Sequence, residues 1–309
     1  MRLARKKREK SPLGAQWNRK RQEKMTITAM TWNWMEGGLS RPNEKGLREP
    51  ILARREAARA LVKRTRPDVL TLNEALGGSD EIGAHIQCFA DILGFKHHVY
   101  GAYDGLWGNA ILSQWPIVEV RRELIHKDGP QNRGLLAAKI AFPDGEAWVA
   151  TYHPHPRRAA EKRAKDVRQF ISELSGPAWL SADFNALEPG DPVDVESLVK
   201  VHERFMKPQA ARESVERFVV AGELLFDGVF PELGWTPVTP EDRLPTMPTA
   251  LIRHPGDKGM RIDHIVVGPE IKSARAWVDQ AAEADLASDH YPVLARIEIG
   301  GAPNPERLQ

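Results

Sequence analysis

Short runs of β-branched or alternating apolar residues recur along the chain from Met25 onward, separated by stretches with helical periodicity. The runs predict strands at residues 26–34, 68–73, 108–113, 135–142, 147–152, 178–182, 261–267 and 292–299. Helical spacing fills residues 49–65, 81–93 and 157–174, and a further helical pair is predicted between Asp194 and Gly222. This alternation of elements predicts an α/β fold.

The element pattern divides the chain into one body with two short extensions. Residues 1–24 are basic and lack apolar periodicity, which predicts a disordered tail. We expect residues 301–309 to form a short flexible C-terminus. No linker or repeat divides residues 25–300, which we expect to form one α/β domain. The Pro/Gly-rich stretch 236–259 predicts a loop long enough to carry a function.

The composition is that of an ordinary globular protein, at 309 residues with 41% hydrophobic and 28% charged residues. Cys88 is the only cysteine, which excludes an intrachain disulfide and favours a reducing, cytoplasmic location. No apolar run approaches the roughly 20 residues of a membrane-spanning helix. We therefore expect a monomer without membrane contact.

The formal charge of +2 conceals an uneven distribution. Residues 1–24 hold ten lysines and arginines against two glutamates, a charge of +8, which leaves −6 on the remainder. A basic arm of this kind, from Arg2 to Lys24, is attracted to nucleic-acid phosphates. The same composition also fits a solvated extension, or a start site placed too early, because Met25 directly precedes the first strand.

Polar residues stand at the ends of the predicted strands. They are Asn33, Glu74, His153, Asp183, Asn185, Asp263, Asp289 and His290. Scaffolds place functional sites at such positions. If these side chains converge, four carboxylates share a small volume, which is electrostatically costly unless a cation is bound. Oxygen ligands favour Mg²⁺ or Mn²⁺ over zinc, and the histidines supply a base and a donor, so the pattern predicts metal-assisted phosphoester hydrolysis.

Six short motifs occur in one order along the chain: TWN, LNE, GNAILS, SADFN, RIDH and SDHYP. In this order and spacing they resemble the endonuclease/exonuclease/phosphatase superfamily, and the resemblance covers about residues 26–299. It implies a four-layer α/β sandwich of two mostly antiparallel β-sheets flanked by helices. It also implies a metal-dependent phosphoesterase.

The resemblance implies a role for each matching position. Glu74 is the principal ligand of the divalent metal, assisted by Asn33 and Asp289. Asp183 orients or activates the attacking water, and Asn185 holds a phosphate oxygen. In the same comparison, His290 contacts the scissile phosphate and is oriented by Asp263.

Two further positions, His153 and Asn109, follow from the same comparison, and Arg133 is a separate candidate taken from its own local sequence. His153 matches a position that is histidine in pancreatic-type deoxyribonucleases, although His153 and His155 also suggest a zinc pair. Asn109 is expected to reach the substrate, and Arg133 contacts phosphate or is a solvated, salt-bridged arginine.

The chain departs from the family pattern at two positions. The glutamine usually found before the metal-binding glutamate is replaced by Asn73, and the usual glycine before the aspartate is Ala182. Neither change removes a catalytic group.

The motif series, His153 and the basic tail favour a divalent-metal-dependent nuclease, with DNA as the favoured substrate. A phosphodiesterase or phosphatase acting on a small-molecule or lipid phosphoester is the alternative, because the same core serves all these substrates. A binding module without catalysis is disfavoured, since every expected catalytic position is filled.

Overall fold

The computed structural model describes residues 25–38, 51–76, 89–102, 107–125 and 133–299. Twelve strands are found in this part of the chain: β1 (Met25–Asn33), β2 (Val69–Leu76), β3 (His97–Ala102), β4 (Trp107–Ser113), β5 (Ile117–Ile125), β6 (Arg133–Phe142), β7 (Gly145–Tyr152), β8 (Ala178–Asp183), β9 (Thr236–Pro237), β10 (Asp263–Val267), β11 (Ile271–Val278) and β12 (Val293–Ile299). The helices are α1 (Leu52–Thr65), α3 (Ala160–Ser172), α4 (Val195–His202), α5 (Pro208–Gly222), α6 (Phe230–Glu232) and α7 (Ala282–Ala287), with a short turn η1 (Met35–Gly38) and a π-helical turn η2 (Glu223–Val229).

The strands form two six-stranded sheets. Their orders are β11-β12-β1-β2-β4-β3 and β5-β6-β7-β8-β10-β9. Each sheet contains one parallel pair, β1 with β2 and β7 with β8, and its other pairs are antiparallel. The predicted sandwich of two mostly antiparallel sheets is therefore confirmed.

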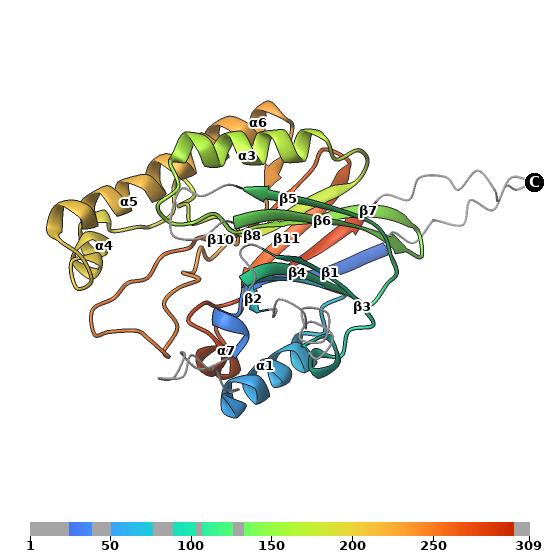
Figure 1. The fold of residues 1–309 in the computed structure, drawn as a ribbon, viewed down its shortest axis with the longest axis horizontal. Coiled ribbons are helices and arrows are strands. Elements are labelled where there is room, and N and C mark those ends of the chain that lie inside the picture. The colour runs from blue at the N-terminus through green and yellow to red at the C-terminus, as the bar shows by residue number, and fades with distance from the viewer. Residues whose placement is uncertain (1–24, 39–50, 77–88, 103–106, 126–132, 300–309) are drawn as a thin grey trace, which may run out of the picture.

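Helices cover the outer faces of both sheets, which gives four layers (Figure 1). Helices α3, α5 and α6 lie on the sheet that contains β5–β8, and α1 and α7 lie on the other sheet. The large apolar side chains Trp32, Trp34 and Trp179 are fully buried in the core. No helix among the described residues is long and apolar enough to cross a membrane.

The eight predicted strands are all interior strands of the two sheets. The four that the pattern missed, β3, β5, β9 and β11, are the sheet edges. An edge strand packs against fewer neighbours and exposes more of its side chains, so its sequence carries a weaker apolar signal. In β5, for example, Val118 is 53% exposed.

The predicted helices 49–65 and 157–174 correspond to α1 and α3, and the pair after Asp194 corresponds to α4 and α5. Of the predicted helix 81–93, residues 89–93 are helical and residues 81–88 lie outside the described residues. The predicted basic tail 1–24 and C-terminus 301–309 also lie outside them. The predicted loop 236–259 is irregular except for β9 and an isolated bridge between Met247 and Met260.

Candidate active site

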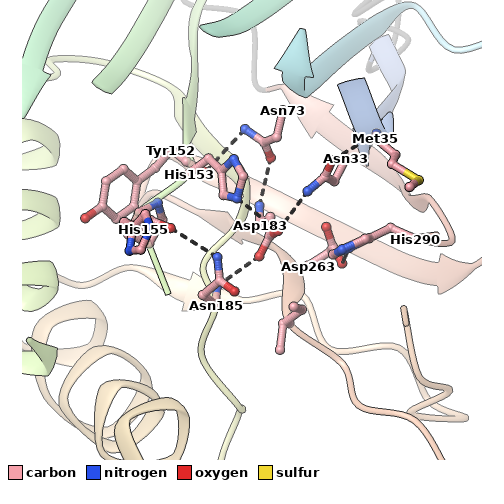
Figure 2. Close-up of polar contacts among 12 residues, drawn as sticks. Asn33, Met35, Asn73, Tyr152, His153, His155, Asp183, Asn185, Asp263 and His290 are labelled. Atoms are coloured by element: carbon pink, nitrogen blue, oxygen red, sulfur yellow. Dashed lines mark hydrogen bonds and ion pairs between the residues drawn. The ribbon is translucent and has the colours of Figure 1, made fainter. Parts of the chain in front are cut away.

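Strand register brings the polar strand ends together. Asn33 is paired with Asn73 across the parallel strands β1 and β2, and Asp183 is paired with Asp263 across the antiparallel strands β8 and β10. Figure 2 shows these four side chains and those of His153, Asn185 and His290 grouped in one region. The convergence expected from the sequence is therefore present for these residues.

A β-bulge in β2 places Glu74. Leu72 pairs with Ala110 and Ala75 with Gly108, so Asn73 and Glu74 together face the single residue Asn109. Glu74 adopts a left-handed backbone conformation with φ of 55°. A β-bulge changes the direction in which a side chain points, and bulges are frequent next to functional sites. Residues other than glycine rarely adopt a positive φ, and those that do are often found at functional sites. The bulge thus separates the two neighbouring side chains Asn73 and Glu74.

Asp183 contacts three other candidate residues, Asn33, His153 and Asn185. Its Oδ2 accepts a hydrogen bond from Asn33 Nδ2 at 3.1 Å and lies 3.4 Å from Nε2 of His153. Its Oδ1 accepts from the backbone N–H of Asn185 at 2.9 Å. Burial, together with the nearby Asp263 carboxylate, raises the pKa of Asp183 to about 6.

His290 and Asp263 form a buried pair in which His290 Nδ1 lies 2.8 Å from Asp263 Oδ2. Burial alone would lower the pKa of His290, but Asp263, assisted by Asp289 and Asp183, raises that pKa well above its usual value. The imidazole is thereby held in its protonated form, with Nδ1 engaged by the carboxylate. Such a group acts as a hydrogen-bond donor.

The segment that carries Asp289 and His290 is attached to the end of β1. Ser288 Oγ donates to the backbone carbonyl of Asn33 at 2.6 Å, and the indole N–H of Trp32 donates to the carbonyl of His290 at 2.9 Å. These two bonds bring residues that are more than 250 positions apart in the sequence into one site.

Glu74 and Asp289 lie close enough to influence one another. Burial, followed by the charge of Asp289, raises the pKa of Glu74 to about 7, while Arg133 and His290 oppose this rise. Glu74 and Asp289 also lie near the buried guanidinium of Arg54. Two crowded carboxylates of this kind favour a bound cation.

The chemistry of the donors fits a hard divalent ion. Among the described residues, the group with three mutually close ligand atoms is Asp183, Asp263 and His290, within 4.8 Å of one another. Asp263 Oδ1 in that group is buried and has no hydrogen-bond partner among the described residues. A protonated histidine is not a metal ligand, however. The carboxylates of Glu74 and Asp289 beside this group therefore fit the ion better.

The zinc alternative at His153 and His155 receives no support from this geometry. Neither histidine belongs to the three-ligand group found in the described part of the chain. His155 Nδ1 accepts a hydrogen bond from the backbone N–H of Arg157 at 3.1 Å. Burial, followed by the charges of Arg133 and His290, lowers the pKa of His153 well below its usual value, so this ring is neutral.

Asn109 and Arg133 differ in their relation to the site. Asn109 is only 1% exposed, accepts from Asn73 Nδ2 at 2.6 Å and donates to the carbonyl of Gly134 at 2.9 Å. Both ends of its carboxamide are therefore engaged, and its contact with substrate stays a prediction. The charge of Arg133 lowers the pKa of His153, of His155 and of Glu74, which places Arg133 near both the histidines and Glu74.

Sequence reasoning missed several buried arginines, and two of them, Arg54 and Arg163, hold backbone carbonyls next to the site. Arg54 donates to the carbonyls of Ala287 at 3.0 Å and Met35 at 2.9 Å, thereby joining the end of α7 to the turn η1 that follows β1. Arg163 donates to the carbonyls of Arg158 at 3.0 Å, Pro156 at 2.6 Å and Asn185.

Each arginine lies on the apolar stripe of its helix, and this position in the sequence could have predicted that its side chain is buried. Arg54 shares its stripe with Ala58 and Leu61, and Arg163 shares its stripe with Val167 and Phe170. A charged residue at such a position is buried and needs partners.

The sequence model of the endonuclease/exonuclease/phosphatase family matches residues 30–290. No curated protein sequence matches the chain.

Solved structures of the same fold include an endonuclease/exonuclease/phosphatase from Beutenbergia cavernae DSM 12333, with a TM-score of 0.58 and 18% identity over 90% of this chain and 73% of that one. An AP endonuclease from Archaeoglobus fulgidus has a TM-score of 0.57 and 20% identity, over 88% of this chain and 100% of that one. D. rerio TDP2, complexed with a single-strand DNA product, has a TM-score of 0.56 and 15% identity, over 88% of this chain and 99% of that one. At these identities the similarity establishes a shared fold.

Proposed function

Because the chain belongs to the endonuclease/exonuclease/phosphatase family, whose members hydrolyse phosphoester bonds, we propose that it is a divalent-metal-dependent nuclease with DNA as the favoured substrate. The observation that carries the proposal is the buried cluster of Asp183, Asp263 and His290 beside Glu74 and Asp289. The A. fulgidus neighbour is an AP endonuclease and the D. rerio neighbour holds a DNA product, which supports nucleic acid as the substrate.

Glu74 and Asp289 are the residues proposed to hold Mg²⁺ or Mn²⁺, with Asn33 assisting. When bound, such an ion polarises a phosphoryl oxygen and stabilises the charge that develops on it. The carboxamide oxygen of Asn33 accepts from the backbone N–H of Met35 at 3.1 Å, and its Nδ2 donates to Asp183. Asn33 therefore holds Asp183 against the turn that follows β1.

Asp183 is the proposed base that orients and deprotonates the attacking water. Its raised pKa of about 6 brings it near neutrality, where a general base is most effective. Asn185, whose Nδ2 donates to the carbonyl of Pro154 at 3.1 Å, is proposed to hold a phosphate oxygen. The neutral His153 beside Asp183 completes this side of the reaction centre.

His290 is the proposed donor to the scissile phosphate. The Asp263 carboxylate fixes its Nδ1, which leaves Nε2–H to face the substrate. A protonated imidazole stabilises negative charge as it builds on the phosphoryl oxygens. Arg133 is proposed to add a second positive charge near the substrate.

The test is hydrolysis of supercoiled plasmid, single-stranded DNA, RNA and a panel of inositol phosphates, each with Mg²⁺ and with EDTA. The proposal predicts nicking of plasmid that EDTA abolishes. Turnover restricted to inositol phosphates would instead establish the small-molecule phosphoesterase alternative.

The basic segment 1–24 is proposed to add phosphate contacts. Deleting it is expected to weaken DNA affinity and to flatten the dependence of that affinity on salt, while turnover at saturating substrate stays similar. Fluorescence anisotropy across a salt series measures both effects. Equal salt slopes for the two proteins would exclude a role for this segment in binding.

A further inference from the structure

An apolar cavity of about 190 Å³ lies between α4 and the long loop that precedes β10. Its walls include Leu198, His202, Phe205, Met247, Ile252 and Met260. Drug-sized pockets run roughly 300–1,000 Å³, so this cavity suits a single planar group. Phe205 is 73% exposed and Ile252 38%, so large apolar side chains at this cavity remain in contact with solvent.

Residues 246–249 connect this cavity to the candidate active site. Thr246 Oγ1 accepts from the backbone N–H of Asp263 at 3.3 Å, and Thr249 N–H donates to the carbonyl of Asp289 at 3.1 Å. The two residues between these threonines, Met247 and Pro248, line the cavity. A group in the cavity therefore lies a few residues of chain away from the proposed metal ligand and the Asp263–His290 pair.

A histidine with an unpartnered ring nitrogen is one of the residues that line the cavity. His202 Nδ1 is buried and has no hydrogen-bond partner among the residues that the structure describes. Burial and the charge of Arg217 lower the pKa of His202, so the ring is neutral at neutral pH. A neutral imidazole offers a single hydrogen bond to the edge of a heterocycle.

A cation stands beside the cavity. The exposed Arg253 donates to the carbonyl of Pro248 at 2.7 Å, and the ion pairs of the described residues include no carboxylate partner for it. The lining also includes His254 and Asp257, whose carboxylate is paired with Arg204. A mainly apolar slot lined by His202, with an adjacent guanidinium, matches a base joined to a phosphate backbone. An acyl chain would use neither the imidazole nitrogen nor the guanidinium.

We propose that this cavity binds one nucleobase of the nucleic-acid strand close to the scissile phosphate. The inference rests on the proposed nuclease function and adds a determinant of substrate selection to it. The base stacks against the apolar and aromatic walls, its edge meets His202, and Arg253 contacts the neighbouring phosphate.

The test compares two substitutions on adjacent exposed aliphatic residues. Ile252→Trp fills the cavity, whereas Leu251→Trp adds the same side chain at a 40% exposed residue that does not line it. Anisotropy in EDTA, where hydrolysis is prevented, gives the affinities for a fluorescein-labelled thymidine decamer and for a decamer of abasic tetrahydrofuran units. Thermal melting checks that both variants fold.

The wild-type protein and Leu251→Trp are expected to bind the thymidine decamer about tenfold more tightly than the abasic one, as one stacked base predicts. Ile252→Trp is expected to remove that difference while retaining affinity for the abasic decamer. Equal affinities of the wild-type protein for the two decamers, or an unchanged preference in Ile252→Trp, would overturn the proposal.

Failure of the proposed function gives a different result. If plasmid and oligonucleotides are cleaved with Mg²⁺ but base preference is absent, the cavity proposal alone fails. If base-dependent binding is present and no nucleic acid is cleaved under any condition, the proposed nuclease activity alone fails. Absence of binding to either decamer overturns both.

Discussion

The backbone N–H of Asp183 donates to Oδ1 of Asn73 at 2.9 Å, and this bond joins β8 of one sheet to the bulge of β2 in the other. Asn73 also donates to Asn109 at 2.6 Å and to Thr151 at 3.1 Å, and it is fully buried. Asn73, one of the two residues that depart from the family pattern, thus links the strand end that carries Glu74 to the strand end that carries Asp183.

Asn73→Ala is expected to lower the free energy of unfolding by about 2–4 kcal/mol, because it leaves several buried polar groups without partners. Urea denaturation measures the change. Gln114→Ala is the matched control, since that side chain makes an exposed hydrogen bond to the carbonyl of Gly94 at 2.8 Å, and it should stay within about 0.5 kcal/mol. A similar small loss in Asn73→Ala would show that the link does not stabilise the fold.

Glu74→Gln is expected to abolish metal-dependent turnover and to raise the stability of the metal-free protein at neutral pH. The pKa of Glu74 is raised from 4.5 to about 7, so the folded state holds a proton that the unfolded state has lost in this interval. Stability of the metal-free wild-type protein therefore falls as pH rises from about 4.5 to 7.

Thermal melting in EDTA across this pH range is expected to show a flatter profile for Glu74→Gln. Mg²⁺ should stabilise the wild-type protein and leave this variant almost unchanged, because only the wild-type carboxylate pair binds the ion. Equal stabilisation of both proteins by Mg²⁺ would exclude Glu74 as a ligand.

Asp263→Asn is expected to reduce kcat by roughly 10²–10⁴-fold, the range for loss of a positioned proton-transfer group, while the protein stays folded. The substitution removes the carboxylate that raises the pKa of His290. Histidine-ring NMR in EDTA should therefore show His290 charged above neutral pH in the wild-type protein, and losing its proton at lower pH in the variant. An unmoved titration would contradict the pairing.

Arg163→Lys is expected to destabilise the protein by about 2–3 kcal/mol, since lysine cannot satisfy the carbonyls of Arg158, Pro156 and Asn185 together. Arg168→Lys on the same helix is the control, because its ion pair with Glu232 is exposed and contributes little. The free energy of unfolding and kcat are measured for both. Because Arg163 holds the carbonyl of Asn185, the residue proposed to bind a phosphate oxygen, kcat of Arg163→Lys is also expected to fall. A kcat equal to wild type would show that this guanidinium does not position Asn185.

The sequence alone predicted the interior of the fold. Each of the eight predicted strands has neighbours on both sides in its sheet, so burial imposed a regular apolar pattern on it. The motifs at the ends of those strands also identified Asp183, Asp263 and His290, which the structure brings together. The local sequence was sufficient to identify these three residues because each of them lies at or next to a strand end.

The edge strands, and the contacts that hold the site residues in place, could be identified only from the tertiary structure. The bulge at Glu74, the link through Asn73 and the carbonyls held by Arg163 depend on contacts between segments that are distant in the sequence. The cavity beside Met247 exists only where α4 meets the loop before β10. A pattern of residue types along one chain records which groups are polar, whereas their partners are set by how the two sheets pack.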